Sequence, residues 1–191
     1  ESEWPDSKPT WSGADGSDGS STATVDTSSP SSSSTGTTVT ATCGTSSKAM
    51  KVCVVGVKSV SADGITSTTD SPGEGETILI PVGDDPITIT TAPDPDNAQW
   101  PTEKPTWENA SGNAGSTSAT FNPSEAGEKI VKAVCGNFKA VKIVSILVTL
   151  NDTSVPICAK TSMNKETISL SDSDFIKEIN VSTEPAGYEY L

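Results

Sequence analysis

The segment "KIVKAVCGNFKAVKIVSILV", residues 129–148, decides the fold, because it carries two runs of alternating side chains on either side of a glycine. Side chains alternate between the two faces of an extended strand. Val131, Ala133 and Cys135 would therefore share one face of the first run, and the residues between them would share the other. The segment predicts two strands joined by a tight turn at "GNF", residues 136–138.

The sequence before this segment has the same character. The stretches "ETILIPVG" (76–83), "PITITTAPDP" (86–95) and "SATF" (118–121) have the composition of short strands and are followed by turns rich in proline, glycine and acidic residues. Nothing in the chain shows an apolar period of 3.6 residues, which an amphipathic helix would need. The sequence predicts an all-β protein with strands spaced as in immunoglobulin-like β-sandwiches of about 90 residues.

A tryptophan motif indicates that this pattern is repeated. "WPDSKPTW" (4–11) returns as "WPTEKPTW" (100–107) with six of eight residues identical. The spacing between the two copies falls from 96 residues at the tryptophans to 92 at Cys43 and Cys135. The first copy is therefore longer, and we place its extra residues in the serine-rich loop near Ser31–Ser34. An insertion into a surface turn costs little, so one fold accommodates both copies.

The C-terminal tail repeats an earlier stretch more weakly. "ETISLSDSDFIKEINVSTEPAG" (166–187) lies 90 residues after "ETILIPVGDDPITITTAPDPDN" (76–97), and both begin with Glu-Thr-Ile. We expect two strands in this tail, with the apolar side chains Ile168, Leu170, Ile179 and Val181. The predicted domains are an incomplete immunoglobulin-like domain over 1–58, a complete one over 59–150, and the first strands of a further domain over 151–191.

An incomplete sandwich leaves a sheet edge and a core uncovered, so something has to fill the gap. Two alternatives follow from the predicted organisation. In the first, the tail of one subunit donates its strands, through Ile168, Leu170, Ile179 and Val181, to the first domain of the next subunit, which builds an open filament. In the second, the 191 residues are one slice of a longer covalent array of such domains. Both alternatives predict a fibre or a stalk.

The run from "ETILIPVG" to "AVKIVSILV" resembles the tandem Ig-like repeats of bacterial and archaeal surface proteins, the broad group of Big and PKD-like domains. The resemblance covers most of the chain and implies a stalk, adhesin, sheath or filament. We therefore expect an extracellular or cell-surface structural protein whose partner is a further copy of itself or an adjacent repeat. An adhesin or carbohydrate-binding module, with a glycan ligand, is the alternative.

The composition excludes several other classes of function. The chain has 25 acidic residues against 12 basic ones, all of them lysine, and a net charge of -13, so it offers no basic surface to nucleic acid. It has no histidine, the usual general base and metal ligand. No phosphate loop or nucleophile motif occurs, and no apolar run reaches the roughly 18 residues that span a bilayer. We expect neither enzymatic activity nor membrane insertion.

Four cysteines, Cys43, Cys53, Cys135 and Cys158, allow three disulfide pairings. Their spacing has no C-x-x-C motif, which argues against a zinc site. We expect disulfides, with Cys135 to Cys158 as the favoured pair, and hence an oxidising compartment. Buried free thiols that pack as small apolar groups are the alternative.

The remaining candidates are aromatic, acidic and glycosylation sites. We expect Trp11 and Trp107 to fill the core from a central strand, as the tryptophan of an immunoglobulin domain does. Acidic turns at 15–19, 82–86 and 93–97 could offer oxygen ligands to calcium, but no EF-hand spacing is present, and we favour solvated loops without a cofactor. The sequons that could carry glycans begin at Asn109, Asn151 and Asn180.

Overall fold

The computed structural model describes residues 8–150 and 181–188. These residues contain no α-helix and one short 3-10 turn, η1 (Glu74–Glu76), so the predicted all-β class is confirmed. The strands are β1 (Thr10–Ser12), β2 (Thr37–Cys43), β3 (Ser46–Val52), β4 (Gly56–Ala62), β5 (Ile65–Ser67), β6 (Thr77–Pro81), β7 (Ile87–Asp94), β8 (Thr106–Glu108), β9 (Ser118–Phe121), β10 (Gly127–Cys135), β11 (Asn137–Leu150) and β12 (Val181–Glu184).

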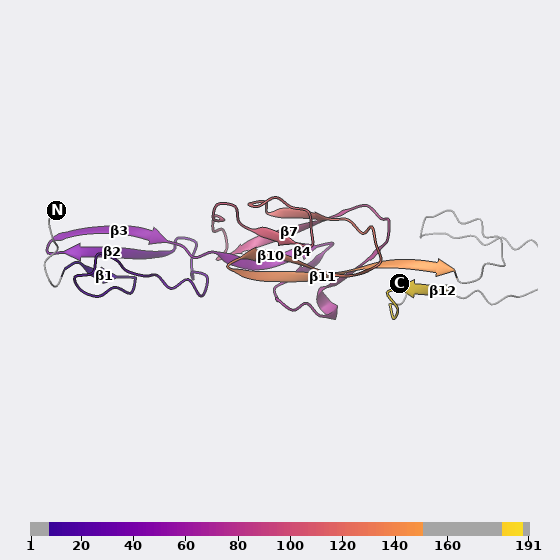
Figure 1. The fold of residues 1–191 in the computed structure, drawn as a ribbon. Coiled ribbons are helices and arrows are strands. Elements are labelled where there is room, and N and C mark those ends of the chain that lie inside the picture. Colours follow the sequence, from indigo (N-terminus) through magenta and orange to yellow (C-terminus); the bar gives the residue numbers. More distant parts are fainter. Residues whose placement is uncertain (1–7, 151–180, 189–191) are drawn as a thin grey trace, which may run out of the picture.

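The described strands form three sheets along an elongated molecule. The first has the order β1-β2-β3, the second has the order β12-β11-β10-β8 with β6 parallel to β11, and the third has the order β5-β4-β7-β9. In Figure 1 the first sheet lies at the N-terminal end, the other two lie together in the middle, and β12 lies at the far end. We call residues 8–52 the N-terminal repeat and residues 56–145 the central repeat.

The core lies between the second and third sheets of the central repeat. Val57, Val60 and Ile89 enter it from the third sheet and are 0% exposed. Val131, Val141 and Ile143 meet them from β10 and β11 and are also 0% exposed. Two sheets that enclose one apolar core have the architecture of a β-sandwich.

The predicted strands at 76–83 and 86–95 are present as β6 and β7, but they are not the first strands of the central repeat. β4 and β5 precede them, and β4 crosses the domain boundary expected at residue 58. The register between β4 and β7 shifts at Lys58, so Val57 and Val60 are both buried although they stand three residues apart. This bulge breaks the period of two by which a strand is found in a sequence.

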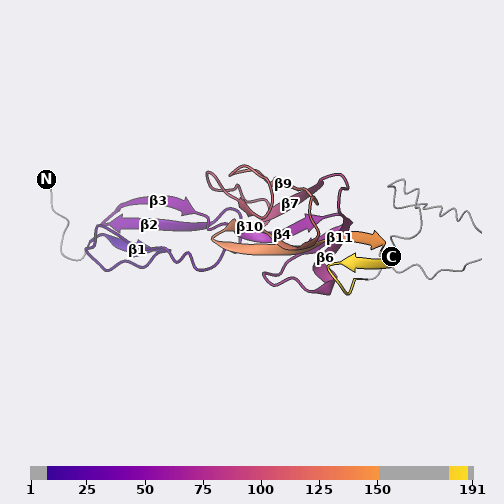
Figure 2. The same cartoon turned by 45° about the vertical axis from the view of Figure 1, so that its right-hand side comes forward.

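Strand β11 is 14 residues long and pairs with three neighbours, one of which is β6 along 142–146. Its residues 137–145 pair with β10, and its last four, 147–150, pair with β12. Leu147 lies opposite Glu184 there, as Gly56 lies opposite Asp94 where β4 begins its pairing with β7. Figure 2 shows β11 leaving the sandwich to meet β12. We call the end of β11 together with β12 the C-terminal pair.

The two tryptophan strands differ from the expectation in one respect. β1 and β8 have three residues each and lie at the edges of their sheets among the described strands, so the prediction that Trp11 and Trp107 lie on a central strand is wrong for the part of the chain that the structure describes. Each borders a long loop, and the strand is short because that loop departs from the sheet directly after Ser12 or Glu108.

Candidate functional site

The N-terminal and central repeats share their local structure. The indole nitrogen of Trp11 donates a hydrogen bond of 3.0 Å to the carbonyl oxygen of Ser20, and that of Trp107 donates one of 2.9 Å to Ser116. Trp11 lies opposite Ala41 in the ladder, as Trp107 lies opposite Ala133. The sequence repeat is therefore also a structural repeat, in which β1, β2 and β3 correspond to β8, β10 and β11.

A glycine under each tryptophan completes the shared structure. A Cβ atom on Gly16 would come within 2.6 Å of Cδ1 of Trp11, and one on Gly112 would come within 2.7 Å of Cδ1 of Trp107. Carbon atoms do not approach so closely without a shift of the surroundings. Glycine is therefore needed at both positions for the indole ring to lie on its own loop.

The repeats differ in what covers the sheet. We define the inner face of the N-terminal sheet by the residues that correspond to core residues of the central repeat, which are Val39, Ala41, Cys43, Met50 and Val52. Their counterparts are Val131, Ala133, Cys135, Val141 and Ile143, all of them in the core cluster. Met50 is 64% exposed, whereas Val141 is 0% exposed. No described strand covers the inner face, and this face is the candidate functional site.

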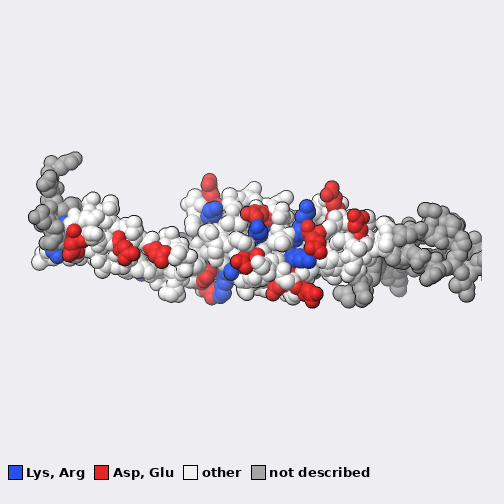
Figure 3. All heavy atoms as spheres, turned by 60° about the horizontal axis from the view of Figure 1, so that its bottom comes forward, with Lys and Arg blue, Asp and Glu red and all other residues white. Residues whose placement is uncertain are grey.

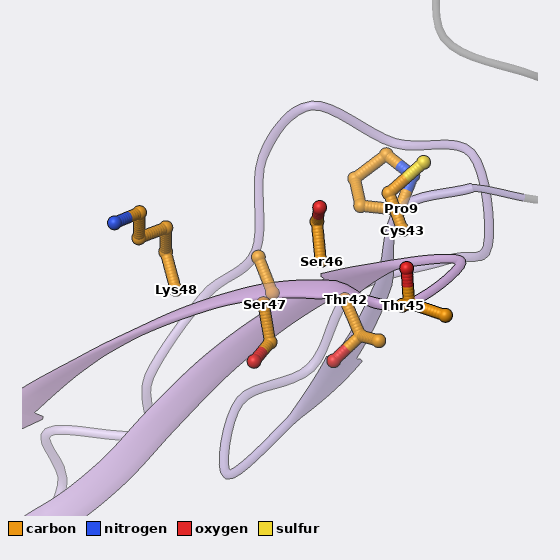
Figure 4. A pocket seen from close by; sticks show the side chains of 8 residues that line it. Pro9, Thr42, Cys43, Thr45, Ser46, Ser47 and Lys48 are labelled. Atoms are coloured by element: carbon orange, nitrogen blue, oxygen red, sulfur yellow. The ribbon is translucent and has the colours of Figure 1, made fainter.

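At its outer end the inner face forms a hollow of about 500 Å³. Pro9, Ala41, Cys43 and Ser46 line it at the turn between β2 and β3. Figure 4 shows the side chains of Pro9, Cys43 and Ser46 on one side of the sheet and those of Thr42 and Ser47 on the other. Thr42 and Ser47 also line the hollow, which therefore lies around this end of the sheet. Its part at Pro9, Cys43 and Ser46 is on the same side as Met50, because Ser46 and Met50 stand four positions apart on one strand.

In the central repeat, a passing strand occupies the place that corresponds to the hollow. There the chain at Val55–Val57 passes over the turn between β10 and β11. The side-chain oxygen of Asn137 accepts a hydrogen bond of 2.6 Å from the backbone N–H of Val57, and its amide nitrogen donates one of 3.2 Å to the carbonyl of Val57. The thiol of Cys135 donates to the carbonyl of Val55 at 3.3 Å. The turn thus holds a passing strand by its backbone.

The same passing strand is also held by the N-terminal repeat. The backbone N–H of Ser31 donates to the carbonyl of Val54 at 2.9 Å, and the hydroxyl of Ser31 accepts a bond of 2.9 Å from the N–H of Val54. A Cβ on Gly56 would lie 2.8 Å from Pro30 and 2.7 Å from Asn137. The serine-rich insertion therefore fastens the connection between the repeats.

At the other end of the molecule, three polar side chains hold the turn after β12 against the sandwich. The hydroxyl of Tyr188 donates to Glu128, and the ammonium of Lys142 lies 3.0 Å from the same carboxylate and 5.9 Å from the tyrosine ring centre. The hydrogen bond from Tyr188 and then that from Lys142 lower the pKa of Glu128. The interaction with Tyr188 and then that with Glu128 raise the pKa of Lys142. Both shifts favour the charged pair.

On the face shown in Figure 3, surface charge does not single out another site. Lysine and acidic side chains lie close together there over the middle of the molecule, and neither sign forms a broad patch. The described residues contain no group of three or more side chains suited to a metal ion. The expected absence of a nucleic-acid partner and of a cofactor stays a prediction.

The described cysteines do not form the expected disulfides. Cys43, Cys53 and Cys135 are free thiols, and burial raises the pKa of the Cys135 thiol, against a smaller lowering by Lys104. Cys158, the expected partner of Cys135, lies outside the described residues. Cys135 is buried and its thiol bonds a backbone carbonyl, so the alternative of a packed free thiol describes Cys135, whereas Cys43 and Cys53 are only partly buried.

The other candidate residues fall into two groups. Trp100 and Trp107 both pack, partly buried, against the core. Asn109 donates its side-chain amide to the carbonyl of Ile130 at 2.8 Å. Val181 begins β12. The residues outside the described ranges are Trp4, Asn151, Asn180, Ile168, Leu170 and Ile179.

No family model, curated protein or solved structure matches this chain. Among the described residues, no helix has the length and apolar character needed to cross a membrane. The functional argument therefore depends on the geometry of the chain itself.

Proposed function

We propose that this chain is an extracellular structural protein, the repeating unit of a surface filament or stalk that is assembled head to tail through immunoglobulin-like domains. Its activity is to associate with units of its own kind and to hold them in line. The acidic, serine- and threonine-rich composition and the elongated form of the described residues agree with such a role.

One observation carries the proposal: the same sheet occurs twice, and among the described residues a second sheet covers it in the central repeat only, although Val39 of the inner face is 6% exposed. Burial of apolar surface stabilises by roughly 25 cal/mol per Å², so a sheet built for a core gains free energy when a second sheet covers it. Met50, at 64% exposure, stands where the central repeat has the fully buried Val141. A unit of the same fold is the partner that this face fits.

The two arrangements foreseen from the sequence remain open within this proposal. The cover comes either from a separate chain or from an adjacent repeat of one longer polypeptide, and both give an extended assembly. The contact is head to tail because the uncovered sheet and the C-terminal pair are different surfaces at opposite ends of the molecule. Such contacts do not close on themselves and produce open filaments.

Electron microscopy and electrophoresis of native material test the proposal. We expect extended assemblies by negative staining, which either dissociate to single chains in denaturant or keep a very high mass in it. The first result indicates separate subunits and the second a long repeat polypeptide. Native material that is globular and monomeric under all conditions would contradict the proposal.

The location is tested separately. Antibodies raised against the 191-residue chain should label intact, unpermeabilised cells of the source organism at the surface. Labelling that requires permeabilised cells would contradict an extracellular role.

A further inference from the structure

The central repeat defines the kind of cover that the inner face lacks. There β4 enters through Val55–Val57, lies over the sheet of β10 and β11, and pairs with β7 on its other side. Val57 is 0% exposed in that position. The equivalent cover of the N-terminal sheet would be a strand pair of the same kind, entering over the hollow at Pro9, Cys43 and Ser46.

A strand pair of this kind is present at the opposite end of the chain. In the C-terminal pair Val148 lies opposite Thr183, as Val57 lies opposite Pro93 in the central repeat. Val148 therefore corresponds to Val57, but it is only partly buried, and its neighbour Leu147 is 38% exposed. The pair lies far from the N-terminal sheet in both ribbon views, so the C-terminal pair does not cover the inner face of its own chain.

We infer that the C-terminal pair of one chain docks on the inner face of a neighbouring chain, with Ile146–Val148 seated in the hollow lined by Pro9, Cys43 and Ser46. The side chain of Val148 then turns toward the face that carries Met50. This inference rests on the proposed function and deepens it, because it names the two surfaces that meet and their register.

The contact between chains differs from the connection within the chain at one turn. Ser46 stands where the central repeat has Asn137, and its side chain is shorter than the amide that bonds both the N–H and the carbonyl of Val57. We therefore expect the contact between chains to be weaker than the connection within the chain, and reversible.

Two single variants of the full chain test the inference, one at each surface. Met50→Asp places a charge on the inner face, and Thr38→Asp is its matched control, since Thr38 is exposed on the same sheet and pairs with Lys51, whose side chain faces away from Met50. Val148→Asp places a charge on the C-terminal pair. Sedimentation velocity would compare all three variants with the wild type over a range of concentrations.

The expected result has two parts. Met50→Asp and Val148→Asp should each remain a single chain at concentrations where the wild type and Thr38→Asp assemble. An equimolar mixture of the two blocked variants should form a species of twice the mass of one chain and nothing larger, because the mixture contains one intact pair of surfaces. The dimer also shows that both variants are folded.

Each other outcome has a distinct meaning. Assembly of Met50→Asp or Val148→Asp that matches the wild type would overturn this contact and leave the filament proposal standing. Two blocked variants that fail to form a dimer when mixed would overturn the head-to-tail pairing of these two surfaces. If native material shows no fibres and the wild-type chain also stays monomeric at every concentration, the proposed function itself is contradicted.

Discussion

The N-terminal and central repeats are the same sheet in two environments. Both have the tryptophan bonded to a loop carbonyl and the same ladder from the tryptophan strand to its neighbour. They differ in cover, because only the central repeat has a second sheet among the described residues. The comparison shows that local sequence fixes the strands and the loop, whereas burial of the face depends on strands from elsewhere.

The largest expected effect separates the two repeats by their cores. Val141→Ala should lower the free energy of unfolding of the central sandwich by about 2 kcal/mol or more, because it removes fully buried methyl groups and leaves a cavity. Met50→Ala, at the matching position, should cost less than about 0.5 kcal/mol, since the side chain is exposed. Urea unfolding followed by tryptophan fluorescence measures both, and equal losses would contradict the difference in cover.

The next effect concerns the turn that holds the passing strand. Asn137→Ala removes two hydrogen bonds to the backbone of Val57 and should destabilise the central repeat by about 1–3 kcal/mol, at roughly 0.5–1.5 kcal/mol for each bond. Ser46→Ala at the matching turn should leave the stability of the single chain unchanged. If Ser46→Ala lowered the free energy of unfolding as much as Asn137→Ala does, the turn between β2 and β3 would already hold a strand in the single chain.

A third pair of variants tests what the repeats share. Trp11→Phe and Trp107→Phe each remove an indole hydrogen bond, to Ser20 and to Ser116 respectively, worth about 1 kcal/mol. We expect faster amide hydrogen exchange in the loop beside each altered residue, by a similar factor in both repeats. Faster exchange in Trp107→Phe alone would mean that the structure of the loop beside Trp107 depends on the second sheet.

The smallest effect is a pH dependence at the C-terminal pair. The lowered pKa of Glu128 contributes stability that is present above its unfolded pKa and is lost as pH falls through the folded one. The raised pKa of Lys142 contributes stability that is lost as pH rises through the folded value. Hydrogen exchange of β12, corrected for intrinsic rates, should therefore be slowest between these limits.

Tyr188→Phe supplies the control for this pH dependence. The variant removes the hydroxyl that donates to Glu128 and should flatten the acidic side of the profile. The effect stays small because Glu128 and Lys142 are in contact with solvent, which screens their interaction. An unchanged profile in the variant would assign the acid sensitivity of β12 to another group.

The sequence predicted the repeat and most strands of the central sandwich, because these depend on side-chain alternation and local turns. It did not reveal β4 as a strand, since the bulge at Lys58 shifts the phase between Val57 and Val60. It also placed the tryptophans on central strands, because the motif does not tell an edge from an interior position. Both errors have the same cause: the strands that pair with one another can be far apart in the chain, and a local sequence pattern does not show which strands pair.

The candidate site was predictable in outline only. The shifted repeat indicated an uncovered face, but the bonds from Asn137 to Val57 join residues 80 apart in the chain, and no local signal points to them. An alignment of Met50 with Val141 could have located the site more directly. It places an apolar side chain at a core position for which the same repeat offers no covering strand.

Strand β11 has a consequence for the geometry of any longer assembly. At about 3.3 Å per residue its 14 residues extend for roughly 46 Å, from inside the central sandwich to β12. A strand has a right-handed twist along its length, so each unit attached to its far end is rotated relative to the one before it. Successive units would then follow a screw axis, and the pitch of that helix would be set by the backbone of this single strand.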